Sequence, residues 1–246
     1  MPIVKYRQFG DRPPPQQIRI NVPGWAGDKS PRADGSHEQP WHCMPFSESA
    51  RYGLELVYPY DQELCVSTKD GKVELQADWG PPPPDMSAWP PFRPFGDDYY
   101  SYQLDLDLEA PPGFAVRVEP HPRYFTDPTY STPLAVPALI RSDWWPMLFF
   151  CIFRAPPPGV THWFRKGEPF IAFTVVPAEP ELTLEPMDPE TAAQREMRSR
   201  RLAASRDKLA EGTKWMSDTN TIFDGTYRNL ARAARIKAKG STEVGP

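Results

Sequence analysis

Residues 102–123 read YQLDLDLEAPPGFAVRVEPHPR, and this stretch decides the fold of the chain. In its first half Tyr and Leu alternate with Gln, Asp and Glu, the pattern of a strand with one buried face. A turn at Pro111-Pro112-Gly113 follows. The alternation then resumes and reaches Arg123 if it survives Pro120 and Pro122. The stretch therefore predicts two strands, the second with a mixed-charge face.

Further strands are predicted on both sides of this pair. Alternating or β-branched runs occur at residues 1–10, 17–22, 53–58, 62–68, 72–77, 134–140, 161–165 and 169–176. The run Met147–Phe153 is almost continuously apolar, as a strand covered on both faces requires, so it is predicted to be the deepest element of the core. We therefore expect residues 1–188 to form a mainly β body, a double-sheet β-sandwich or jelly roll of cupin-like type.

Composition supports this fold class. The chain has 246 residues, of which 33 are Pro, and proline is excluded from helix interiors and from central strands. Short strands joined by stiff loops are the expected result, and a helical architecture is excluded for the first 188 residues. The 39% hydrophobic and 13% aromatic content is enough to fill a core.

A helical tail is predicted for residues 189–246. Asp188 suits the N-cap of a helix and Pro189 its first position, and this helix is expected to end before Gly212. A second helix is expected at about residues 225–239, with its apolar residues on one stripe. These residues are Tyr227, Leu230, Ala231 and Ala234.

Charge is distributed unevenly between body and tail. Residues 1–188 contain 16 Lys and Arg against 25 Asp and Glu, whereas residues 189–239 contain 12 against 6. We therefore expect a basic tail that packs on the acidic body or on a partner. Nucleic-acid binding is not favoured by sequence alone, because Gly-rich, zinc-finger and RNP-like signatures are missing.

Four short segments together resemble a known family. They are Ala110-Pro111-Pro112-Gly113-Phe114, Glu119-Pro120-His121-Pro122-Arg123, Trp144-Trp145-Pro146 and Lys166-Gly167-Glu168-Pro169. Their order and spacing resemble an uncharacterised family of bacterial and phage proteins, a domain of unknown function, across about residues 40–180. Ala110 departs from that family's pattern, which usually has Thr at this position. The resemblance implies a shared β fold and implies no activity.

Cysteine usage and hydropathy indicate the expected compartment. The three cysteines, Cys43, Cys65 and Cys151, are widely spaced and include no Cys-x-x-Cys pair, so neither a disulfide framework nor a zinc ribbon is predicted. The N-terminal residues lack the apolar run of a signal peptide, and no apolar run is long enough to span a bilayer. We expect a soluble, cytoplasmic protein that does not bind membranes.

His121 is the best candidate for a functional side chain. On a regular strand it would share a face with Glu119, Arg117 and Arg123, and a His and a carboxylate two positions apart are a common start of a cupin-type metal site. His162 on another predicted strand would complete a ligand set for a divalent transition metal such as iron, with Asp127 as the alternative third ligand.

In this hypothesis Arg117 or Arg123 is a catalytic residue that holds an anionic group of the substrate. The His-x-Asp spacing of iron oxygenases and the His-x-His spacing of cupins are both missing. The competing interpretation is a solvated salt-bridge face, in which the same charged residues pair with each other or across strands.

Two functions follow from these patterns. The first is a cupin-like enzyme, a metal-dependent oxidoreductase acting on a small-molecule or peptide substrate. The second is a structural or interaction protein that assembles, for example as a homo-oligomer, through its charged helical tail.

Overall fold

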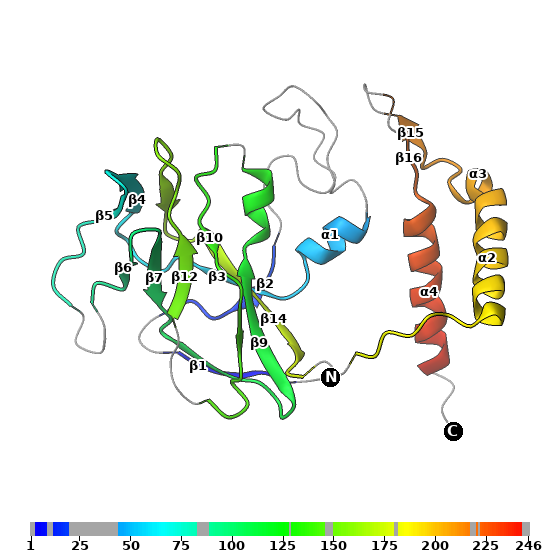
Figure 1. The fold of residues 1–246 in the computed structure, drawn as a ribbon, viewed down its shortest axis with the longest axis horizontal. Coiled ribbons are helices and arrows are strands. Elements are labelled where there is room, and N and C mark those ends of the chain that lie inside the picture. The colour runs from blue at the N-terminus through cyan, green and yellow to red at the C-terminus, as the bar shows by residue number, and fades with distance from the viewer. Residues whose placement is uncertain are drawn as a thin grey trace. The chain divides into compact units, whose positions relative to one another are not determined.

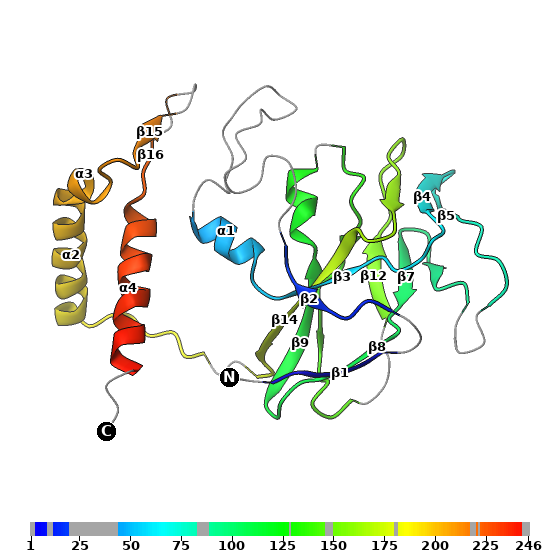
Figure 2. The same ribbon diagram turned by 180° about the vertical axis from the view of Figure 1, so that it is seen from behind.

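The computed structural model describes residues 3–8, 12–19, 44–82, 89–127, 129–145, 150–179, 182–216, 220 and 222–242. The chain divides into two compact units, one comprising Met1–Pro23 and Ser49–Pro180 and the other Gly24–Glu48 and Glu181–Pro246. The first unit is β-rich and the second contains the C-terminal helices (Figures 1 and 2). The second unit thus begins eight residues before the helical tail expected from sequence and also takes in an N-terminal segment.

A five-stranded antiparallel sheet forms one layer of the first unit, with the order β11-β9-β14-β3-β2. The strands are β11 (Ala138–Ile140), β9 (Phe114–Pro120), β14 (Pro169–Pro177), β3 (Leu54–Val57) and β2 (Gln16–Gln17). β14 lies between β9 and β3 and is buried along most of its length, which its run of Phe, Ile, Ala and Val permits.

Three further antiparallel sheets complete the first unit. A four-stranded sheet has the order β10-β12-β7-β6, made of Leu134–Ala135, Phe150–Arg154, Tyr99–Gln103 and Phe92–Phe95. A three-stranded sheet has the order β13-β4-β5, made of His162–Phe164, Leu64–Lys69 and Lys72–Gln76. β1 (Lys5–Gln8) pairs with β8 (Leu106–Glu109).

Aromatic side chains from these sheets meet in one core. Phe92, Tyr100, Phe153, Phe164 and Phe170 are almost fully buried, and their ring centroids lie 4.8–6.1 Å apart in the contacting pairs. Edge and tilted contacts of this kind add to the burial of the rings. The mainly β fold class predicted from sequence is confirmed by these sheets.

The prediction that Met147–Phe153 forms the deepest strand of the core is wrong for the residues that are described. Residues 147–149 lie outside the described part of the chain, and β12 begins at Phe150 with 53% of that residue exposed. Only Cys151 and Phe153 of β12 are buried, so this strand has one face in the core. The tryptophans before it, Trp144 and Trp145, are also exposed and do not fill the space between sheets.

Helices account for most of the described residues of the second unit. The predicted tail helices are found, as α2 (Pro189–Ala204) and α4 (Thr226–Thr242), with a break at Ser205 before the short α3 (Arg206–Leu209). A hairpin of β15 (Trp215–Met216) and β16 (Ile222–Phe223) joins α3 to α4. The N-terminal helix is α1 (Met44–Ala50). No described helix is both long and apolar enough to cross a bilayer.

Candidate functional sites

The face of the five-stranded sheet opposite the core carries a row of polar residues. Cross-strand register aligns Gln16, Glu55, Ala172 and Glu119 on β2, β3, β14 and β9, so all four side chains project from the same face. Glu55 is only 2% exposed. A carboxylate this deeply buried requires hydrogen-bond donors, because burial without them is costly.

Glu55 receives three hydrogen bonds. The Gln16 side-chain amide donates to Oε1 at 2.9 Å, the Arg19 backbone N–H donates to Oε2 at 3.3 Å, and His121 Nε2 lies 2.9 Å from Oε2. Glu55 therefore connects β3 to β2, to the residues just after β2 and to the end of β9.

His121 is brought to this site by the prolines on either side of it. β9 ends at Pro120, and Pro122 starts the 3₁₀ helix η2 (Pro122–Thr126), so His121 becomes the N-cap of that helix with φ −67° and ψ 136°. The strand alternation expected up to Arg123 therefore stops at Pro120. His121 itself is 2% exposed.

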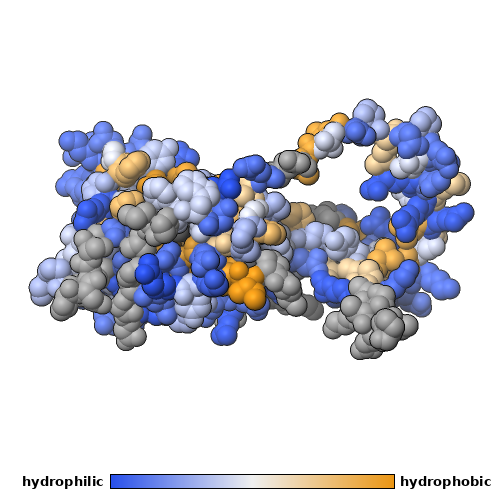
Figure 3. All heavy atoms as spheres, turned by 90° about the horizontal axis from the view of Figure 1, so that it is seen from below, coloured by the Kyte–Doolittle hydropathy of each residue, from blue (hydrophilic) through white to orange (hydrophobic). Residues whose placement is uncertain are grey.

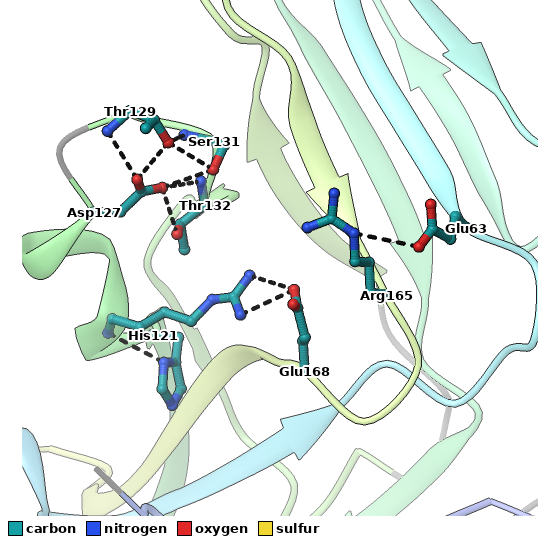
Figure 4. A network of polar contacts seen from close by, with 9 residues as sticks. Glu63, His121, Asp127, Thr129, Ser131, Thr132, Arg165 and Glu168 are labelled. Atoms are coloured by element: carbon teal, nitrogen blue, oxygen red, sulfur yellow. Dashed lines mark hydrogen bonds and ion pairs between the residues drawn. The ribbon is translucent and has the colours of Figure 1, made fainter. Parts of the chain in front are cut away.

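Hydrogen bonding fixes the tautomer of His121. The Arg123 backbone N–H donates to Nδ1 at 3.2 Å, so Nδ1 is an acceptor (Figure 4). Nε2 then carries the proton and donates to Glu55 Oε2. Burial lowers the pKa of His121 below its usual value, against the opposing effect of Glu55, so the ring is neutral at pH 7.

Ala172 makes this pairing sterically feasible. Glu55 and Glu119 flank Ala172 in the cross-strand register, and His121 follows Glu119 by two residues. The bond between Glu55 and His121 must therefore cross the central strand near Ala172, which has the smallest side chain that an L-residue can place there. Ala172 is itself buried, so there is no free space above it for a larger side chain.

The neighbouring charges form ion pairs. Arg117 Nε lies 2.7 Å from Glu119 Oε1, and both side chains are partly exposed. Two guanidinium nitrogens of Arg123 lie 3.1 Å from Glu168 Oε2, in the turn before β14 (Figure 4). These pairs match the salt-bridge interpretation of the polar face.

His162 lies in the three-stranded sheet, whereas His121 follows β9 of the five-stranded sheet. It is buried on β13, and its Nδ1 lies 2.9 Å from the hydroxyl of Tyr100. Burial raises the pKa of Tyr100 well above its ordinary value, so the hydroxyl keeps its proton and donates to the ring. Burial lowers the pKa of His162 to about 4, against a smaller opposing effect of Asp127.

Asp127 is engaged by its own loop. Its carboxylate accepts hydrogen bonds from the backbone N–H groups of Thr129 and Thr132 and from the hydroxyls of Thr129, Ser131 and Thr132 (Figure 4). Burial raises the pKa of Asp127, but these bonds outweigh it and lower the pKa to about 2. The side chain stabilises the loop.

The residues expected to bind a metal are therefore not brought together. His121 is bonded to Glu55, Glu119 to Arg117, and His162 to Tyr100. Across the described residues, no three or more His, Cys, Asp and Glu side chains lie close enough to share a metal ion. The two arginines expected to be catalytic, Arg117 and Arg123, bind carboxylates of the protein itself.

Sequence reasoning missed Glu55 and Gln16. In the predicted strand at 53–58, Glu55 is the one charged residue between Leu54 and Leu56, which is the ordinary pattern of a solvent-facing position. Residues 16–19 and His121 contact Glu55 on that face, and these contacts between distant parts of the chain have no local sequence signal.

A small pocket lies elsewhere in the first unit. Gln8, Arg12, Tyr102 and Asp105 supply its polar lining, and its volume is about 20 Å3, room for one water molecule. Arg12 lies 3.2 Å from Asp105, and its guanidinium stacks 4.3 Å from the ring centre of Tyr60. A pocket of this volume does not accommodate an organic substrate.

The second candidate site is the pair of tail helices. α2 is capped by Asp188, whose carboxylate accepts from Thr191 N at 2.9 Å, and carries one i,i+4 ion pair, Glu196 with Arg200. All sixteen residues of α2 are described, and none is buried. α2 therefore has little packing to hold it within the second unit.

α4 is held near its N-terminal end by two contacts, and farther along Arg235 pairs with Glu48. Asn229 donates to the carbonyl of Leu209 at 2.7 Å, and Asp224 pairs with Arg206. From Arg232 to Lys237 every residue is exposed. The apolar stripe expected from sequence is present, with Tyr227 exposed and Leu230 partly buried.

Comparison with known proteins identifies no family. No family model matches the chain, and no curated protein is significantly similar to it. Among solved structures, the native dUTPase of EIAV aligns with a TM-score of 0.38 and 10% sequence identity, over 76% of this chain and 98% of that chain. A likeness at this level identifies neither a fold nor a function.

Proposed function

We propose that this chain is an interaction protein that assembles with a second copy of itself through its helical tail. The observation that carries the proposal is α2, a helix of 16 residues without one buried side chain. An isolated helix of this length is marginal in water, so most of its stability has to come from packing against another surface.

The side-chain pattern of both helices supports a protein partner. In α2, Ala193, Met197 and Ala204 lie on one face, and in α4 Tyr227, Leu230 and Ala234 do. Both stripes combine small residues with a few large ones, which permits close helix packing. Pairing two copies would bury four such stripes, as in a four-helix bundle.

Light scattering after size-exclusion chromatography tests the proposal on the full chain across a range of concentrations. We expect wild type to be a dimer or larger, and Met197→Glu or Ala234→Glu to weaken association at least tenfold. Ser199→Glu and Ile236→Glu are matched controls, since they add the same side chain to the opposite side of each helix. Circular dichroism of each variant reports whether the helices persist.

Two results would overturn the proposal. One is a wild-type chain that stays monomeric at every concentration, which would indicate that the tail packs on its own body. The other is equal weakening by the stripe variants and by their controls.

The cupin-like, metal-dependent enzyme has less support as an alternative proposal. His121 and His162 each have a ring nitrogen engaged with another protein group, and the buried Glu55 already has three donors. Metal analysis of the purified protein, with thermal shifts on adding iron or zinc, tests it. Stoichiometric metal lost on His121→Asn would restore the enzyme hypothesis.

A further inference from the structure

One face of α4 carries arginines at a regular spacing. Arg228, Arg232 and Arg235 are four and three residues apart, which places them on the same side of the helix, beside the apolar stripe. All three are exposed. Arg235 pairs with Glu48 and still has 65% of its side chain exposed. We call these three residues the basic face of α4.

The charge around the basic face is also positive. Residues 189–239 contain twice as many Lys and Arg as Asp and Glu, and eight of the twelve cations are Arg. Arginine presents a planar set of donors that matches phosphate oxygens in pairs and is less strongly hydrated than lysine. The arginine-rich composition of the tail therefore favours binding to phosphate groups over binding to a surface of carboxylates.

We propose that the basic face of α4 binds the phosphate backbone of double-stranded DNA without reading its sequence. Arg228 and Arg235 are seven residues apart, so at about 1.5 Å per residue they are separated by about 10 Å along the helix axis. Duplex DNA carries one negative charge for every 1.7 Å or so of its axis, so three arginines over this length meet phosphates in any register. Backbone binding requires none of the base-reading motifs that this sequence lacks.

An anionic membrane is a weaker fit to the same helix. Insertion into a bilayer surface relies on large apolar side chains, whereas two of the four stripe residues of α4 are Ala and only two, Tyr227 and Leu230, are large. Most of the surface seen in Figure 3 is hydrophilic, and its hydrophobic residues are scattered.

Fluorescence anisotropy with a labelled duplex, using the full chain, tests the proposal. Three phosphate contacts predict that affinity falls about 40-fold between 50 and 200 mM salt. In Arg228→Gln/Arg232→Gln one contact remains, and the same salt change should weaken binding only about 3-fold. Arg228→Lys/Arg232→Lys keeps both charges and should keep most of the salt dependence.

Arg195→Gln/Arg201→Gln is the matched control, because it removes the same charge from α2. We expect it to retain the wild-type salt dependence, and equal losses in the two double variants would overturn the assignment to α4. Absence of duplex binding at 50 mM salt would also overturn it. So would tighter binding to vesicles containing phosphatidylserine, or to polyglutamate, than to DNA.

Failure of this proposal is distinguishable from failure of self-assembly. Arg228 and Arg232 lie away from the stripe of Tyr227, Leu230 and Ala234, so their Gln variants should keep the wild-type mass in light scattering. If these variants lose DNA binding and keep their oligomeric state, the result supports DNA binding by the basic face and leaves the self-assembly proposal untouched.

Discussion

Replacing Glu55 tests the buried polar site most directly. Glu55→Ala removes the acceptor of three donors: the Gln16 amide, the Arg19 N–H and His121 Nε2. Each donor left buried without a partner costs about 1–3 kcal/mol. Since the Arg19 bond is the longest of the three at 3.3 Å and contributes least, we expect Glu55→Ala to lower the free energy of unfolding by about 3–5 kcal/mol.

Glu55→Gln should cost far less, about 1 kcal/mol or less. Its amide oxygen can accept from His121 and Arg19, while its NH₂ group faces Gln16, whose own amide can rotate to present oxygen. Gln16 can thus change from donor to acceptor toward position 55. His121 cannot, because its Nδ1 already accepts from Arg123 N and its Nε2 therefore has to donate. The small cost therefore depends on a neutral His121.

Urea unfolding followed by the fluorescence of the eight tryptophans measures both variants. Glu63→Gln is the control: Glu63 forms an exposed ion pair with Arg165 at 3.3 Å, which should contribute about 0.5 kcal/mol or less (Figure 4). If Glu55→Gln were as destabilising as Glu55→Ala, the negative charge would be essential. His121 would then be protonated, and the tautomer argument would be refuted.

Three further measurements examine the first unit. Ala172→Leu should destabilise it by about 1–3 kcal/mol, because the added carbons have to share the buried space near Glu55; Ala172→Ser, of nearly native size, is its control in the same urea assay. Gly53→Ala should lower the urea unfolding midpoint more than Gly113→Ala does. Both glycines have positive φ, but only at Gly53 would a Cβ lie 2.3 Å from a backbone oxygen, that of Phe173. Equal unfolding midpoints of the two variants would contradict this. Because the pKa of His162 is depressed to about 4 while an unfolded His titrates near 6.5, the unfolded chain binds the proton first, and stability should fall by about 3 kcal/mol as pH drops from 6.5 to 4. His162→Gln should flatten that slope, and an unchanged slope would argue against a buried neutral ring.

Sequence patterns predicted the strands well where alternation was uninterrupted. β9 follows the predicted alternation from Val116 to Glu119, with Val116 and Val118 buried and Arg117 exposed. The acidic strand β8 pairs in register with basic residues of β1, Lys5 opposite Glu109 and Arg7 opposite Asp107. Both outcomes follow from local period and cross-strand charge, which a sequence displays directly.

The candidate metal site was harder to predict because it depended on distant packing. Whether His121 stays on the strand face is decided by the two prolines beside it, and whether His162 approaches His121 is decided by sheet order. The order of the strands and the contacts of His121 depend on residues far apart in the sequence, so short sequence patterns do not predict them. The ring of His121 is instead paired with Glu55, which is 66 positions earlier in the chain.

The position of β14 has a consequence for how the molecule is made. It is the last strand of the first unit to leave the ribosome, yet it is the one that separates β9 from β3. Until residues 169–177 emerge, a nascent chain holds two strands with unsatisfied edges and no partner between them. Premature termination before Pro169 should therefore yield aggregating fragments, whereas stopping after Pro180 should release a soluble body.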